Sequence, residues 1–204
     1  MTAARLRGIT PSLLSAEGTR MKTEKEKMLA GEIYQANDPE LTQDRKRAKK
    51  RCQQINQHDT DDLPGREARL AELMRFKGTF YVEPPLYVDY GYNIHVGDNF
   101  YANHGLTILD GAPVVIGNNV FIAPNVVIAT AGHPLDKTQR ATGEEFVKPI
   151  TIGDDVWLGA HVTLCPGVTL GNNVVVGAGS TVVHDLPDNS VCVGTPARPV
   201  KTLE

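Results

Sequence analysis

Aliphatic residues recur at every sixth position along the carboxyl-terminal part of the chain. They form the unbroken series Ile152, Leu158, Leu164, Leu170, Val176 and Val182. Glycine, asparagine, aspartate and threonine fill most of the positions between them. A period of six matches neither the 3.6-residue period of an amphipathic helix nor the alternation of a half-buried strand. It is typical of a parallel β-helix, in which each hexad forms one short strand and one turn.

The same period predicts which side chains stack inside the solenoid. Three hexads close one coil of about 18 residues, and successive coils lie about 4.8 Å apart. Ile152 is therefore expected to lie against Leu170, and Leu158 against Val176. Earlier hexads continue the pattern in two further phases, at Ile116, Ile122 and Ile128 and at Val96, Ala102 and Ile108. The fold class predicted from these repeats is mainly β, with a parallel β-helix as its main body.

One polar segment, residues 130–149, interrupts the repeats. Four hexads fit between Ile128 and Ile152, but the stretch between them does not keep the pattern. A loop that leaves a regular solenoid is a common place for functional residues, because the scaffold holds the loop in position. We therefore expect residues 130–149 to form an excursion loop that carries functional side chains.

The amino-terminal part of the chain follows a helical pattern instead. Residues 23–30 open with a Thr-x-x-Glu cap pattern and end at Gly31, and further helices are predicted at 39–57 and 66–76, with a turn-rich break at 59–65. The predicted organisation is a leader or disordered extension at 1–21, a helical segment at 22–77 and a β-helix at 78–204.

Charge divides the chain in the same way. Of the net charge of −3, the first 77 residues carry +4 and the rest −7. The basic run at residues 45–51 fits a solvated helix face better than a nucleic-acid surface, because few aromatic residues lie among the cations. The composition excludes bulk disorder and gives no general electrostatic case for binding nucleic acid or a membrane.

The three cysteines, Cys52, Cys165 and Cys192, lack the spacing of metal ligands or of a disulfide framework. Residues 1–20 contain no apolar stretch of the kind that a secretory signal requires. These two observations predict reduced thiols and a cytoplasmic location.

Several motifs together resemble the maltose and galactoside O-acetyltransferases. The motifs are 90–94 (Tyr-Gly-Tyr-Asn-Ile), 99–103 (Asn-Phe-Tyr-Ala-Asn), 131–135 (Ala-Gly-His-Pro-Leu) and 194–198 (Gly-Thr-Pro-Ala-Arg). The helical segment 23–31 is similar to the amino-terminal segment of the same enzymes, so the resemblance covers residues 22–203. It implies a left-handed β-helix and a homotrimer that binds acetyl-coenzyme A between neighbouring subunits and requires no metal.

The resemblance also implies the reaction and its central residues. His133 matches the family's catalytic histidine, which takes the proton from a sugar hydroxyl during direct acetyl transfer. Imidazole suits this role because it exchanges protons near neutral pH. Asn103 matches an asparagine beside the acceptor and the reacting centre.

Acceptor-binding residues are expected at Asp89, Asn103 and Asp110. Asp89 replaces a serine of the galactoside enzymes and is similar to the maltose type. An acidic acceptor contact of the galactoside enzymes falls on Ala36 here, whereas Asp38 is out of register. These departures favour a maltose- or glucose-type acceptor.

For acetyl-coenzyme A, the resemblance implies contacts along several coils. The expected residues are Trp157, Ala160, Ala178, Val183, His184, Arg198 and Lys201. The backbone N–H of Ala160 is expected to stabilise the thioester oxygen as it becomes negative. Arg198 and Lys201 are expected to meet the phosphates, since two cations in an acidic region suit a polyanion.

Three alternatives remain open at this point. A related acyltransferase could use serine, an antibiotic or a lipo-oligosaccharide precursor as the acceptor. A carbonic-anhydrase-like β-helix could bind zinc through three of the histidines His95, His104, His133, His161 and His184. A β-helix without catalytic activity could serve as a scaffold, although this reading leaves the polar loop unexplained.

Overall fold

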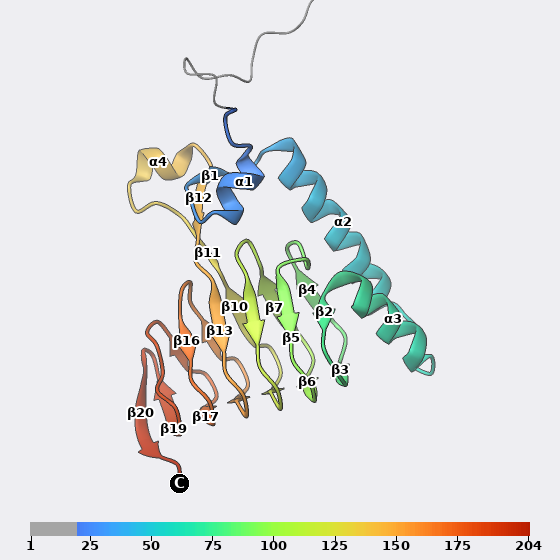
Figure 1. Ribbon diagram of the computed structural model, residues 1–204, viewed down its shortest axis with the longest axis vertical. Coiled ribbons are helices and arrows are strands. Elements are labelled where there is room, and N and C mark those ends of the chain that lie inside the picture. Colours follow the sequence, from blue (N-terminus) through green and yellow to red (C-terminus); the bar gives the residue numbers. More distant parts are fainter. Residues whose placement is uncertain (1–19) are drawn as a thin grey trace, which may run out of the picture.

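The computed structural model describes residues 20–204, so most of the leader predicted at 1–21 lies outside the described residues. The β-strands wind into a three-sided parallel β-helix, with α2 and α3 at its amino-terminal end and the hairpin β19–β20 at the other end (Figure 1). This architecture confirms the predicted fold class. None of the helices within residues 20–204 is long and apolar enough to cross a membrane.

Each side of the prism is one sheet, numbered here as faces 1 to 3. Face 1 contains β2 (Arg75–Phe76), β5 (Ile94–Val96), β8 (Val114–Ile116), β13 (Ile150–Ile152) and β16 (Thr169–Leu170). Face 2 contains β3 (Phe80–Val82), β6 (Phe100–Ala102), β9 (Phe121–Ile122), β14 (Trp157–Leu158), β17 (Val174–Val176), β19 (Ser190–Gly194) and β20 (Ala197–Thr202). Face 3 contains β4 (Leu86–Val88), β7 (Leu106–Leu109), β10 (Val127–Ala129), β15 (Thr163–Leu164) and β18 (Thr181–Val182).

The hexad aliphatics fill the interior of the prism as predicted. Ile152 pairs with Leu170, and Leu158 pairs with Val176, in parallel register. The six aliphatics from Ile152 to Val182 are each at most 1% exposed. Full burial stabilises such a side chain by about 1.5–3 kcal/mol, so the stacked interior is the main source of stability for the solenoid.

The corner between faces 1 and 2 explains the asparagines and aspartates of the repeats. Side-chain oxygens there accept hydrogen bonds from the backbone of the preceding coil, as in Asn118 N–H to Asp154 (2.7 Å) and Asp154 N–H to Asn172 (2.8 Å). The next residue in each turn adopts a left-handed conformation, with φ of 55° at Asn119 and 59° at Asp155. Asparagine and aspartate tolerate this conformation better than other residues with side chains.

Three helices form the amino-terminal segment, and the sequence located two of them closely. α1 (Glu24–Leu29) begins with a capping box at Thr23, and α2 (Pro39–Asn56) begins at the N-cap Asp38. α3 spans Leu63–Leu73, so the predicted helix at 66–76 was placed about three residues too late. The reason is that the Asp62 side chain caps the helix through the Gly65 N–H, while residues 75–76 join face 1 as β2.

The excursion loop is anchored to the amino-terminal segment. Within it, β11 (Ala131–Gly132) and β12 (Glu144–Val147) flank the short helix α4 (Lys137–Ala141). β1 (Tyr34–Gln35) pairs with β12, which makes a three-stranded sheet in the order β1, β12, β11. Residues about 110 positions apart in the sequence therefore meet beside the loop, as the cluster at the top of Figure 1 shows.

Candidate active site

His133 follows β11, where the chain leaves the solenoid. Its imidazole is 53% exposed, and its Nδ1 lies 3.2 Å from the backbone carbonyl oxygen of Glu144. A carbonyl oxygen only accepts hydrogen bonds, so this contact requires the proton of the neutral ring to be on Nδ1. The lone pair is then on Nε2, and this nitrogen is free to accept a proton from an incoming group.

Glu145 lies beside this reactive nitrogen. Its Oε1 is 3.7 Å from His133 Nε2, and its Oε2 accepts a hydrogen bond of 2.7 Å from the hydroxyl of Tyr34. Burial raises the pKa of Tyr34, and the bond to Glu145 raises it further. The phenol therefore remains protonated and holds the carboxylate next to the imidazole.

Arg140 from α4 fixes the segment that follows His133. Its Nη1 donates to the carbonyl oxygens of Pro134 (3.1 Å) and Leu135 (3.0 Å). α4 itself is capped by the Asp136 side chain, which accepts from the Thr138 and Gln139 N–H groups. The excursion loop is therefore held by its own hydrogen bonds as well as by β1.

A cavity of about 230 Å³ opens beside Glu145 and is termed the acceptor cavity below. It is lined by Tyr34, Ala36, Asn37, Arg45, Lys49, Asp89, Tyr90, Gly111, Ala131 and Glu145. The Arg45 guanidinium is held by the Tyr90 hydroxyl (2.7 Å) and the Ala36 carbonyl (2.6 Å). Two carboxylates and two cations therefore face a space in which polar hydroxyl groups find both donors and acceptors.

Asp89 lies in this cavity, as the resemblance implied. Burial raises the pKa of its carboxyl, with a further contribution from Glu145, whereas Arg45 and Lys49 act in the opposite direction. Ala36 also lines the cavity and brings no carboxylate there. The acidic groups at this site are therefore Asp89 and Glu145.

Asp110 is placed differently from the acceptor contact expected for it. It is 0% exposed, and its carboxylate accepts hydrogen bonds from the N–H groups of Tyr90 (2.8 Å) and Gly91 (2.7 Å). No surface of Asp110 is available to a ligand in this structure. It supports the turn that carries Asp89 and Tyr90 instead.

The burial of Asp110 predicts a pH-dependent stability. Desolvation raises its pKa from 3.8 to about 7, although the backbone N–H donors oppose the rise. Because the folded state then binds more protons than the unfolded state between these values, ionisation of this group lowers the free energy of unfolding as pH rises from about 4 to about 7. The Asp110→Asn variant has no carboxyl group here, so this loss of stability with pH does not affect it. Its free energy of unfolding should therefore lie further below that of the unsubstituted protein at pH 4.5 than at pH 7.5. Urea denaturation at the two pH values measures this difference, and an equal difference at both contradicts the prediction.

Asn103 lies at a different corner of the prism from His133. It follows β6 at the corner between faces 2 and 3, and its Oδ1 accepts from the His104 N–H at 2.7 Å. His133, by contrast, belongs to the loop between faces 3 and 1. One copy of the chain therefore does not bring these two predicted catalytic residues together.

Ala160 shares the corner of Asn103. Within residues 20–204, no acceptor is in hydrogen-bonding position for its N–H, whereas its carbonyl accepts from Gly179 (2.8 Å). The coils approach closely here, because a Cβ at Gly159 would lie 2.6 Å from the Ala178 nitrogen. A free backbone donor and the expected contact Ala178 are thus neighbours.

Trp157 lies on the outer surface of face 2 and is 54% exposed. It is in register with Phe121 and Val175, and the Tyr101 ring lies 6.3 Å from that of Phe121. These side chains form an exposed apolar stripe across several coils.

The other residues expected to contact acetyl-coenzyme A are exposed but divided between two places. Arg198 and Lys201 lie on β20 of face 2, whereas Val183 and His184 follow β18 at the corner between faces 3 and 1. The expected donor-binding residues therefore lie on face 2 and at the two corners that carry the expected catalytic residues.

The histidines proposed as zinc ligands are dispersed. His95 is in face 1, His104 and His161 lie at the corner between faces 2 and 3, and His133 and His184 lie between faces 3 and 1. Within residues 20–204, no three His, Cys, Asp or Glu side chains gather closely enough to hold a metal ion. Within residues 20–204, one copy of the chain therefore does not bring three of these histidines together.

Comparison with known proteins shows which family this chain belongs to. Residues 27–75 match the maltose acetyltransferase hexapeptide capping motif, and residues 149–184 match the bacterial transferase hexapeptide repeats. The galactoside O-acetyltransferase of Escherichia coli is 43% identical over 179 residues, which cover 87% of this chain and 88% of the relative. The chain belongs to the maltose and galactoside O-acetyltransferase family.

Solved structures of this family have the same fold. A maltose O-acetyltransferase from Clostridium difficile superposes with a TM-score of 0.88 at 47% identity, covering 90% of this acetyltransferase and 98% of that chain. A galactoside acetyltransferase in complex with coenzyme A gives a TM-score of 0.87 at 41% identity, covering 90% and 92%. The protein is therefore an acetyltransferase enzyme with a left-handed β-helix, and the scaffold alternative is wrong.

Sequence reasoning missed four residues of this acetyltransferase's candidate site. They are Tyr34, Arg45, Lys49 and Glu145. Glu145 has no motif of its own, and its position depends on the pairing of β12 with β1. The pair of acids at 144–145 inside the excursion loop was the one signal for it in the sequence.

Proposed function

We propose that this enzyme transfers the acetyl group of acetyl-coenzyme A directly to a hydroxyl of a sugar of the maltose or glucose type, with His133 as the general base. The observation that carries the proposal is the contact between His133 Nδ1 and the Glu144 carbonyl oxygen, which leaves Nε2 basic beside the acceptor cavity. Family membership and the coenzyme A complex of the solved galactoside acetyltransferase support the donor.

The proposed reaction is a single transfer within a ternary complex. Nε2 of His133 takes the proton from the sugar hydroxyl as the oxygen forms a bond to the thioester carbonyl carbon. The bond from that carbon to sulfur then breaks, and the imidazolium returns the proton to the leaving thiolate. The products are an O-acetyl sugar and the free thiol of coenzyme A.

Glu145 and Ala160 have separate roles in this proposal. The Glu145 carboxylate, held by Tyr34, stabilises the imidazolium that forms during attack. The free N–H of Ala160 donates to the carbonyl oxygen of the thioester, which becomes negative in the tetrahedral intermediate. A backbone donor of this kind is already oriented before the reaction begins.

A second copy of the chain is part of the proposal, because Asn103 and Ala160 lie at one corner and His133 at another. A closed homotrimer would place the corner carrying Asn103 of each subunit against the excursion loop of its neighbour. The residues proposed for the donor, Trp157, Ala178, Val183, His184, Arg198 and Lys201, would then line the groove between two subunits. Asp89 and Asn103 would contact the sugar from opposite sides.

A panel of acceptors tests this function. The purified enzyme is incubated with acetyl-coenzyme A and glucosides, maltose, galactosides, amino sugars, serine or chloramphenicol, and release of the free thiol is followed. We expect turnover with glucosides or maltose well above that with serine or chloramphenicol. Turnover confined to the non-sugar acceptors would overturn the proposed acceptor class.

A further inference from the structure

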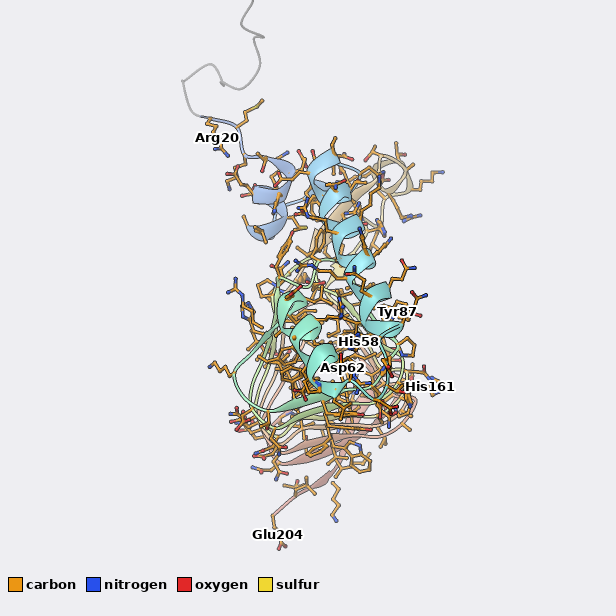
Figure 2. All side chains as sticks on the ribbon, turned by 90° about the vertical axis from the view of Figure 1, so that its right-hand side faces the viewer. Arg20, His58, Asp62, Tyr87, His161 and Glu204 are labelled. Atoms are coloured by element: carbon orange, nitrogen blue, oxygen red, sulfur yellow. The ribbon has the colours of Figure 1, made fainter. Side chains whose placement is uncertain are left out.

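A second cavity lies on the outer surface of face 1, at the amino-terminal end of the solenoid, and is termed the face 1 cavity below. It has a volume of about 650 Å³ and extends across β2, β5 and β8. Figure 2 shows Tyr87 of face 3 and His161, from the corner between faces 2 and 3, on one side of the prism. Face 1 is the sheet opposite that corner, which also carries Asn103 and Ala160. Among the described residues, none lines both the face 1 cavity and the acceptor cavity.

Two cations lie at one end of the face 1 cavity. Arg75 is in β2, and Lys77 directly follows this strand, with its N–H bonded to the Val96 carbonyl oxygen (3.0 Å). Residues two positions apart on a strand point to the same side of the sheet. Phe76 lies between them and packs against the core, with its ring stacked on that of Phe80 (centroids 3.7 Å apart). Arg75 and Lys77 therefore both face outward, into the cavity that they line.

Neither cation has a partner within the protein. Among the arginines of residues 20–204, Arg75 is the one whose guanidinium has no hydrogen bond, ion pair or aromatic ring beside it. In the same part of the chain, the Lys77 ammonium also lacks a carboxylate partner. Asp154 brings a carboxylate to the cavity, but it follows β13, which is three strands or about 14 Å from β2. The donors of Arg75 and Lys77 are therefore available to a ligand.

The middle of the face 1 cavity is mainly apolar. The outward row that begins at Arg75 continues in register through His95 to Val115, whose side chain is 44% exposed. Pro113, just before β8, extends this apolar surface. Val115 is two strands from Arg75, which corresponds to about 10 Å. A cavity with an apolar floor and two cations at one end fits a ligand with an anionic head and a flat apolar body.

We propose that the face 1 cavity binds a small organic phosphate, with the phosphate on Arg75 and Lys77 and the apolar body over His95 and Val115. A phosphate monoester carries a charge of about −1.5 to −2 at neutral pH and three acceptor oxygens. The Arg75 guanidinium meets two of these oxygens with parallel N–H donors, and Lys77 adds a point charge. A carboxylate has one charge and two oxygens, so it uses this pair of cations less fully. The site is independent of the proposed acetyl transfer.

Equilibrium dialysis of the full-length enzyme with phenyl phosphate tests this site. We expect saturable binding with a Kd of about 0.1–1 mM, which is ordinary for a ligand of this size, and about tenfold weaker binding of inorganic phosphate. Arg75→Gln should weaken the binding of phenyl phosphate by about tenfold, the scale of a charge-assisted hydrogen bond. Arg69→Gln is the matched control and should bind normally, because Arg69 is an exposed arginine on α3 that does not line the cavity.

A second variant tests the apolar floor. Val115→Glu places a carboxylate where the apolar body of the ligand would lie, so it should abolish the binding of phenyl phosphate. Val115 is exposed on β8, so the substitution leaves the interior of the solenoid intact. An unchanged midpoint of urea denaturation checks the fold of both variants.

Several results would overturn the inference. Absence of saturable binding of phenyl phosphate removes the site. Equal binding by Arg75→Gln and Arg69→Gln places the phosphate elsewhere on the enzyme, and displacement by coenzyme A in that case assigns it to the donor groove. Equal affinity for inorganic phosphate and phenyl phosphate contradicts the apolar part of the ligand. If Val115→Glu gives a smaller assembly in light scattering, a second copy of the chain covers the cavity and the inference is wrong.

Discussion

His133→Ala is expected to lower kcat for acetyl transfer by about a thousandfold, the scale of losing a general base. Because Nδ1 is engaged by the Glu144 carbonyl oxygen, the lone pair of the neutral ring is on Nε2, which is available to take the proton. Alanine leaves no group that can take the hydroxyl proton. Free-thiol release in the presence of the best sugar acceptor measures the loss.

The matched control for this substitution is His95→Ala. His95 is in face 1, remote from the excursion loop, and should keep its activity. The imidazole of His133 is about half exposed, so His133→Ala should leave the free energy of unfolding within about 0.5 kcal/mol. If the kcat of His133→Ala is within tenfold of that of the unsubstituted enzyme, the proposed mechanism is contradicted.

Mixing two inactive variants should restore activity. We expect His133→Ala and Asn103→Ala to be inactive alone, because each lacks one half of the proposed site. In randomly mixed oligomers with equal amounts of both chains, about one quarter of the sites would combine an intact His133 from one subunit with an intact Asn103 from its neighbour. The mixture should therefore regain about one quarter of the activity after joint unfolding and refolding, measured by free-thiol release.

Each variant refolded alone serves as the control and should stay inactive. If the mixture also stays inactive although affinity capture through a tag on one variant recovers both chains, the site lies within one chain. The arrangement of the corners argues against that result. His133 and Asn103 belong to different corners of the prism, separated by the width of face 3.

Local sequence signals predicted most of the scaffold. The hexad aliphatics located the coils and their register, since one inward side chain per strand must stack on its counterpart. Thr23 and the cap pattern that follows it located α1. The predicted start of α3 was wrong, because the Asp62 cap and Pro64 allow the helix to begin within the segment that was predicted to be a turn-rich break.

The candidate site was less predictable, because its members come from distant segments. Motif resemblance singled out His133, Asn103 and Asp89, but it did not distinguish the half-buried Asp89, which lines the acceptor cavity, from the fully buried Asp110. Glu145 carries no motif, and its contact with Tyr34 spans 111 residues of sequence. Pairings over such distances depend on how the loop docks onto β1.

The sequence by itself determined the solenoid, its coil register, the polar loop that interrupts it and the family resemblance. These features follow from periodicity, turn chemistry and short motifs, which act over a few residues. Only the tertiary structure decided which nitrogen of His133 is free, which carboxylates face the acceptor cavity and which cations line the face 1 cavity. These properties depend on distances between segments that the solenoid and the amino-terminal helices bring together, and short-range patterns do not encode such distances.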